Sequence, residues 1–290
     1  MLYLLLAIAS SSLISVIMRL TESRLSNQMV MVTVNYAVCF GLSLAYVDWA
    51  NTGFLGSSPQ SSIVIGLIAG VLYLAGFVFM KFNMQENGIV LASIFMKLGV
   101  IIPTLMAVVI FGERMEWTRA LGILLAVGAI VLIHFEKEEV LPGSGTAARK
   151  SSGHRGKIFL ILLLLVGGMA DSMTNVFEQL GSPDGKDGFL FVTFFTAFVL
   201  AVIAAFLSKI RPSVQDLLFG LLIGVPNYFS SRFILKALGS VDAVLVYPMF
   251  SVGTLIVVTL AGILFFKEQV SRQKACALAL IVAALCLLNV

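Results

Sequence analysis

The sequence predicts an all-α polytopic membrane protein with ten transmembrane helices arranged as two inverted five-helix repeats. Three observations predict this fold class: an apolar composition, ten apolar segments of membrane-spanning length, and a repeat of about half the chain. Of the 290 residues, 59% are hydrophobic and only 12% are charged, whereas soluble domains average about 25% charged residues. The mean hydropathy is +1.04. This composition excludes a soluble globular protein, because so much apolar surface needs an apolar solvent.

Apolar segments near 20 residues recur along the chain, each long enough to cross ~30 Å of hydrocarbon at ~1.5 Å per residue. We expect spans at residues 2–20, 29–47, 62–82, 89–111, 117–134, 157–180, 188–208, 214–236, 240–266 and 272–289. The first segment lacks a basic leader and a small-residue cleavage site, so we interpret it as a retained helix rather than a signal peptide.

The second half of the chain repeats the first at a spacing of 155 positions. Glu113 lies in the turn Phe-Gly-Glu-Arg-Met after the fourth span, and Glu268 lies in Phe-Lys-Glu-Gln-Val after the ninth. The same spacing pairs Tyr73 with Tyr228, Lys81 with Lys236, Phe95 with Phe250 and Ala120 with Ala275. Residues shared by both halves at helix ends, including the two glutamates, are most simply helix caps or interfacial anchors.

The polar segment 136–156 divides five spans from five. It mixes an acidic run with Gly, Ser and a basic cluster, which is typical of a linker. We therefore expect a first five-helix repeat at 1–135 and a second at 157–290. Because five is odd, two similar halves insert with opposite orientations. Such inverted-topology repeats are a common plan of secondary transporters, whose substrate site lies near the midplane between the halves.

The order of short helices, with a Phe-Gly-Glu type turn closing the fourth and ninth spans, resembles the drug/metabolite transporter superfamily with two EamA-type domains. The resemblance covers nearly the whole chain, although Lys267 replaces the usual Gly in the second turn. It implies a permease in the plasma or inner membrane that moves small metabolites, amino acids or drugs, often outward and without ATP. The chain indeed has no Gly-rich phosphate-binding loop followed by Lys-Ser/Thr.

Basic residues are distributed unevenly between the loops. Loops after odd-numbered spans hold Arg19, Arg24, Lys81, Lys137, Arg149, Lys150, Arg155, Lys157, Lys209, Arg211, Lys267, Arg272 and Lys274. Loops after even-numbered spans hold only Arg114, Arg119, Lys186 and Lys236. The positive-inside rule then predicts a cytoplasmic linker and external termini. The resemblance implies cytoplasmic termini instead, and we favour the charge distribution because it acts on this chain directly.

Charged residues at membrane depth in only one half are the best functional candidates, because the scaffold does not need them. A charge there costs at least ~2.5 kcal/mol, so a partner or an aqueous cavity is expected. Asp171 lies about 14 residues into its span and Lys97 about 8 residues into its own. We expect Asp171 to bind a proton or a substrate amine, and Lys97 to meet an acidic group, with ~9 Å between their levels.

Other polar residues are weaker candidates for binding a substrate or a proton. Glu178 and Arg232 lie at similar depth, so we expect them to pair with each other or to reach the interface. The remaining candidates are Asn175, Asn35, Tyr36, Asn227 and Tyr228, residue types that more often join helices than bind ligands. Three prolines, Pro103, Pro226 and Pro248, should interrupt helix hydrogen bonding in spans four, eight and nine.

The leading hypothesis is a secondary active transporter, an exporter of a small organic solute, working by alternating access. The expected partners are that solute, the lipid bilayer and protons as the coupling ion, with no nucleic acid; monomer and homodimer both stay open. We expect no cofactor or metal, since Cys39, Cys276 and Cys286 all fall in apolar spans. The alternatives are an integral membrane enzyme acting on a lipid or small solute, or a non-transporting scaffold; no HExxH helix or Ser-His-Asp set favours the enzyme.

Overall fold

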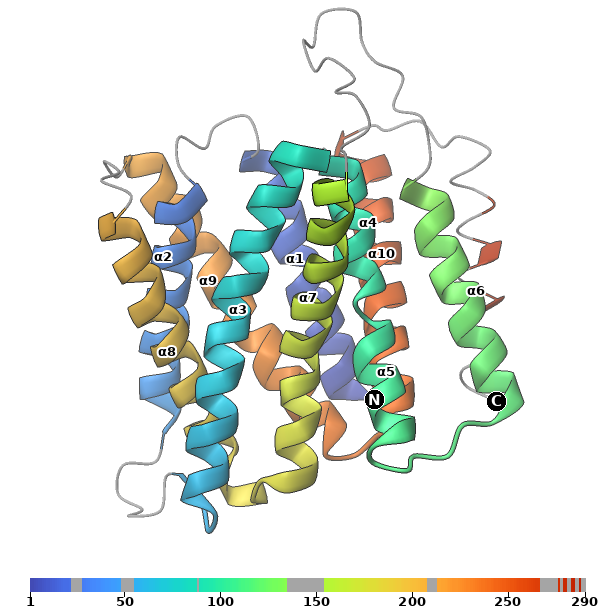
Figure 1. The fold of residues 1–290 in the computed structure, drawn as a ribbon, viewed down its shortest axis with the longest axis horizontal. Helices are drawn as coiled ribbons and strands as arrows, with labels where there is room; N and C mark the ends of the chain where they lie inside the picture. The colour runs from blue at the N-terminus through green and yellow to red at the C-terminus, as the bar shows by residue number, and fades with distance from the viewer. Residues whose placement is uncertain are drawn as a thin grey trace, which may run out of the picture.

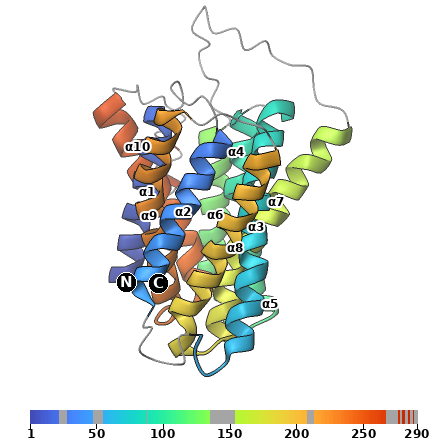
Figure 2. The same ribbon diagram turned by 90° about the vertical axis from the view of Figure 1, so that its left-hand side faces the viewer.

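The computed structural model describes residues 1–21, 28–47, 55–87, 89–134, 154–207 and 213–266, with a few single positions between 276 and 287. The described residues are helical apart from a few turns, without a strand among them. The helices are α1 Leu2–Thr21, α2 Gln28–Tyr46, α3 Pro59–Asn87, α4 Ile89–Leu98, α5 Ile101–Val109, α6 Trp117–His134, α7 His154–Leu180, η1 Pro183–Gly185, α8 Lys186–Leu207, α9 Val214–Leu238 and α10 Ala243–Phe266. They stand side by side in one bundle (Figures 1 and 2).

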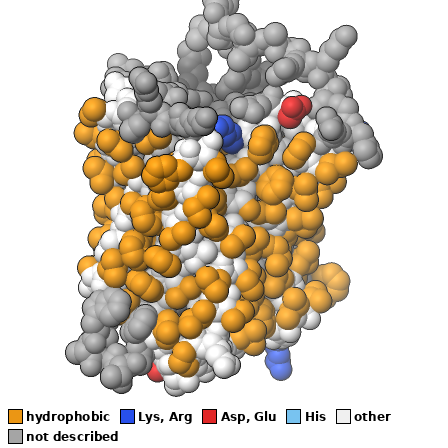
Figure 3. Space-filling view, turned by 60° about the vertical axis from the view of Figure 1, so that its left-hand side comes forward, with side chains coloured by type: hydrophobic (Ala, Val, Ile, Leu, Met, Phe, Trp, Pro, Cys, Tyr) orange, Lys and Arg blue, Asp and Glu red, His pale blue; other side chains and the backbone are white. Residues whose placement is uncertain are grey.

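Six of the described helices are long and apolar enough to cross a membrane: α2, α3, α7, α8, α9 and α10. Three shorter apolar helical segments accompany them: Leu2–Met18 in α1, Phe95–Val109 across α4 and α5, and Trp117–Leu132 in α6. Figure 3 shows one face of the bundle, on which hydrophobic side chains cover the middle and charged side chains are visible only near the two ends. The predicted all-helical, multi-pass membrane fold is confirmed. The exact ten-helix inverted repeat stays a prediction, since most of span 272–289 lies outside the described residues.

The fourth predicted span is broken rather than continuous. It consists of α4 and α5, which are separated by the turn Gly99–Val100. The interruption predicted at Pro103 is present: Pro103, the third residue of α5, has no N–H to donate to the carbonyl of Gly99, four residues earlier, where the turn lies. Pro226 and Pro248 lie inside α9 and α10, as predicted.

The main contacts of α3 and α9 correspond to each other when the two halves of the chain are exchanged. The eighth span, α9, packs against α1 and α2, and its counterpart α3 packs against α7 and α8. The second and seventh spans, α2 and α8, also pack against each other. Each half therefore contributes one helix that lies against the first two helices of the other half.

Two Gly-x-x-x-Gly motifs allow these close contacts between the halves. In α9, a Cβ on Gly220 or Gly224 would lie 2.6 Å from the Cβ of a valine of α2. In α3, a Cβ on Gly66 would lie 2.9 Å from Val192 of α8, and one on Gly70 would lie 2.6 Å from Thr196. Small residues at this spacing let helix backbones approach in a membrane. The two halves thus use the same Gly-x-x-x-Gly motif at the equivalent helices α3 and α9.

Candidate functional site

Asp171 lies deep inside the bundle and is nevertheless accessible to water. It is nine residues before the end of α7, which places it ~14 Å from that end at 1.5 Å per residue. Its side chain is exposed, while the next four residues of α7, Ser172 to Asn175, are buried. Because a bare charge in lipid is very costly, we expect this carboxylate to face an aqueous cavity rather than the lipid.

Lys97 lies across from Asp171 because the break between α4 and α5 contacts α7. A Cβ on Gly168 would lie 2.6 Å from the Gly99 carbonyl oxygen, so the two backbones touch. Lys97 precedes this contact by two residues and Asp171 follows it by three. The half-buried ammonium and the carboxylate attract each other electrostatically. Within the described part of the chain, no salt bridge of 4.0 Å or less joins them.

Two tyrosines complete the surroundings of Asp171, and neither was a predicted site residue. Tyr247 of α10 is buried, and its hydroxyl donates a 2.8 Å hydrogen bond to the backbone carbonyl of Asp171. Tyr73 of α3 lies near Asp171, with its hydroxyl beside Thr174 and Ser231. Tyr73 could have been found in the sequence as the counterpart of Tyr228 in the repeat, but Tyr247 gives no such signal.

Asn175 lies one turn below Asp171, toward the end of α7. Its side chain is 1% exposed, and neither its amide nitrogen nor its amide oxygen has a hydrogen-bond partner. Each unsatisfied buried polar group costs ~1–3 kcal/mol. The structure thus keeps a donor and an acceptor unused beside the candidate site.

Glu178 and Arg232 do not pair with each other, so of the two expected alternatives the pairing is wrong. The carboxylate of Glu178 binds Lys186, whose Nζ lies 2.8 Å from Oε1 and 2.6 Å from Oε2. Arg232 binds Asp187, with 2.7 Å between Nη1 and Oδ1. The reason is the start of α8, which brings Lys186 and Asp187 side by side between the ends of α7 and α9. Arg232 also donates to the Tyr228 hydroxyl at 2.7 Å and lies 4.2 Å from the ring centroid of Tyr46.

The four remaining candidates lie in the contact between α2 and α9. The Asn227 amide donates to the Asn35 amide oxygen at 3.1 Å, so this pair joins the two helices. Tyr36 and Tyr228 are 7% and 0% exposed and belong to the main hydrophobic core. The sequence alone could not distinguish these residues from those around Asp171, because all of them lie at membrane depth.

Glu113 is a cap, but on a helix of the opposite half. Its two carboxylate oxygens accept hydrogen bonds from the backbone N–H groups of Ala243 at 3.2 Å and Val244 at 2.9 Å, in the first turn of α10. The predicted capping role is confirmed for Glu113. Glu268 lies outside the described residues.

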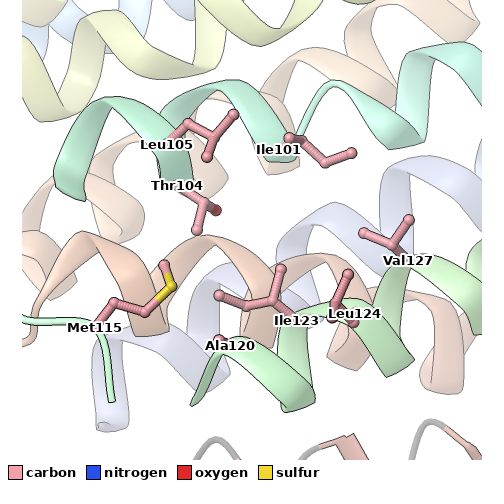
Figure 4. A pocket seen from close by; sticks show the side chains of 8 residues that line it. All are labelled: Ile101, Thr104, Leu105, Met115, Ala120, Ile123, Leu124 and Val127. Atoms are coloured by element: carbon pink, nitrogen blue, oxygen red, sulfur yellow. The ribbon is translucent and has the colours of Figure 1, made fainter. Parts of the chain in front are cut away.

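An apolar pocket of about 320 Å³ opens between α5 and α6, and its lining contains no charged side chain (Figure 4). It is lined by Ile101, Thr104, Leu105, Met115, Ala120, Ile123, Leu124 and Val127. The hydroxyl of Thr104 is bound to the Val100 carbonyl at 2.9 Å. The pocket therefore offers only apolar contacts, and it includes none of the predicted site residues.

Fold and site define a multi-pass helical membrane protein with a water-accessible carboxylate between its halves. Residues 1–135 match the model of the EamA-like transporter family. The match covers the first predicted repeat and confirms the resemblance to EamA-type drug/metabolite transporters drawn from the sequence.

Two further comparisons cover nearly the whole chain. An uncharacterized protein of Haemophilus influenzae is 27% identical over 278 residues, which are 93% of this chain and 91% of that protein. A solved crystal structure with 15% sequence identity aligns with a TM-score of 0.75, covering 99% of this chain and 94% of the other. At this identity the second comparison shows a shared fold alone.

Proposed function

We propose that this protein is a secondary transporter that exports a small organic solute by alternating access between its two halves. The observation that carries the proposal is the exposed Asp171 carboxylate at mid-membrane depth, with the oppositely charged Lys97 nearby and not bound to it. Secondary transporters built from inverted repeats hold substrates and coupling ions at this depth. The family match of residues 1–135 supports the same class.

The charges of the site define the solute and the coupling ion of this proposal. Asp171 binds a proton or the amine of the solute, and Lys97 binds its acidic group. A zwitterionic solute the size of an amino acid suits two opposite charges that attract each other without forming a salt bridge. Tyr73 and Ser231 supply hydroxyl groups on the side formed by α3 and α9.

The described contacts also support a conformation that is closed at one end. Below Asp171, toward the α5–α6 and α9–α10 turns, Asn175 and Tyr247 are buried. At this end the halves are joined by Glu113 to α10, by Arg119 to Asp242 at 3.9 Å, and by Ser57 to Asp184. Water therefore reaches Asp171 from the direction of the opposite end, where α6 ends and α7 begins.

Flux in liposomes tests the proposal. With purified protein, an imposed pH gradient should drive a zwitterionic solute across the liposome membrane, and the solute should remain chemically unchanged. Asp171→Asn should fold normally and lose the response to the pH gradient, because it removes the titrating group and keeps its shape. Lys97→Ala should weaken the binding of acidic solutes. Wild-type, gradient-driven flux by Asp171→Asn would contradict the role of Asp171.

A further inference from the structure

We propose that Glu113 is a latch that holds the α5–α6 turn on the first turn of α10 and keeps this end of the bundle closed. The inference rests on the proposed transport function, which requires this end to open. Both carboxylate oxygens of Glu113 are used, one on the N–H of Ala243 and one on that of Val244. Charge-assisted hydrogen bonds of this kind are stronger than neutral ones, and the helix dipole of α10 adds to them.

The turn that carries Glu113 is shaped for this contact. Gly112 has φ of +68°, a left-handed conformation that glycine adopts easily. The backbone N–H of Glu113 then returns to the carbonyl of Ala107 in α5 at 3.0 Å. The glutamate backbone is thus fixed to α5, and its side chain reaches out of its own half.

The latch joins groups of the two halves that must separate if this end opens. Glu113 belongs to the turn between α5 and α6, whereas Ala243 and Val244 begin α10 in the second half. Beside it, Arg119 of α6 faces Asp242 at 3.9 Å, a longer and more exposed contact. A cap that stabilised only a single helix would be supplied by residues next to that helix, as in ordinary helix capping.

The first turn of α10 also connects the latch to the candidate site. Tyr247 lies one turn after Ala243 and donates its hydrogen bond to the backbone of Asp171. A movement of this turn away from Glu113 would shift Tyr247 relative to α7. Release of the latch and rearrangement around Asp171 therefore involve the same turn of helix.

Glu113→Gln gives a sharp test because it keeps the shape of the side chain. A glutamine side chain accepts through only one of its two terminal atoms, and its NH2 group would face the other backbone N–H donor to donor. Glu116→Gln is the matched control: Glu116 is an exposed glutamate in the same turn, and no described contact involves its side chain. In a background without the native cysteines, spin labels at Arg114→Cys and Ser240→Cys report the distance between the two turns.

We expect Glu113→Gln to raise the ratio of long to short label distances roughly tenfold, since a charge-assisted bond is replaced by a neutral one. Glu116→Gln should leave the distances of the parent protein unchanged. The same distances in all three proteins would overturn the latch, as would a Glu113→Gln protein that no longer folds, because Glu113 would then be a structural cap. The label distances can be measured whether or not the protein transports a solute. A failure of the transport proposal is therefore distinguished from a failure of the latch.

Discussion

Gly99 and Gly168 contact each other backbone to backbone, and this contact sets the separation of the two charges in the candidate site. A Cβ on Gly99 would lie 3.1 Å from the backbone nitrogen of Gly168, and one on Gly168 would lie 2.6 Å from the Gly99 carbonyl oxygen. Lys97 and Asp171 flank this contact on their own helices. A change that separates the two glycines should therefore alter both packing and the distance between the charges.

The first prediction compares two neighbouring glycines of α7. Gly168→Ala should lower the free energy of unfolding by about 1–3 kcal/mol, because a methyl group does not fit against Gly99 and Ile102 without a shift. Gly167→Ala should be neutral or stabilising by up to about 1 kcal/mol, since its Cβ would meet nothing within 4 Å. Thermal unfolding in detergent measures both. Equal stability of the two variants would show that the contact between Gly99 and Gly168 does not stabilise the protein.

The spans and the depth of Asp171 could be predicted because hydrophobicity and helix rise act along the chain alone. The interruption of the fourth span could be predicted too, because Pro103 has no N–H for the carbonyl of Gly99. The contact of Gly99 with Gly168 could not, because it depends on how α7 packs against this turn.

The partners of the charged residues were harder to predict than their depth. Glu178 and Arg232 were expected to meet because their levels agree. The structure instead offers each of them a nearer partner, Lys186 or Asp187, at the start of α8. Depth along a helix is fixed by sequence position, but the direction of a side chain depends on which helices surround it.

The second prediction concerns these two ion pairs. Arg232→Ala and Asp187→Ala should be non-additive in unfolding free energy, with a coupling of about 1 kcal/mol or less because Asp187 is partly exposed. Arg232→Ala and Glu178→Ala should be additive. Double-mutant cycles from thermal or denaturant unfolding measure both couplings. A larger coupling between Arg232 and Glu178 than between Arg232 and Asp187 would contradict the observed pairing.

The third prediction concerns pH and the loop between α7 and α8. Hydrogen bonds from Ser182 first, and then from Ser57, hold the pKa of the exposed Asp184 carboxyl below its usual value of 3.8. A lowered pKa means that the charged form is favoured in the fold, so its stabilising effect is present above about pH 4 and is lost as the pH falls further. Asp184→Asn should therefore be less stable than the parent protein at pH 6, and the difference should shrink toward pH 3. A difference that is independent of pH would show that the charge is not involved.

The last prediction concerns which end of the bundle faces the cytoplasm. Loops after odd-numbered spans carry most of the Lys and Arg residues. At the opposite end, several cations are already engaged within the protein: Lys186 with Glu178, Arg119 with Asp242, and Lys236 over the ring of Tyr3. Cations that are paired within the protein favour a cytoplasmic position of that end less than free ones, which reinforces the positive-inside prediction.

In a background without the native cysteines, Glu116→Cys should react with an impermeant thiol reagent added to intact cells. Lys157→Cys, an equally exposed position at the other end, should react only after the cells are permeabilised. The reverse pattern would place the termini in the cytoplasm and would make the closed end described above the cytoplasmic one.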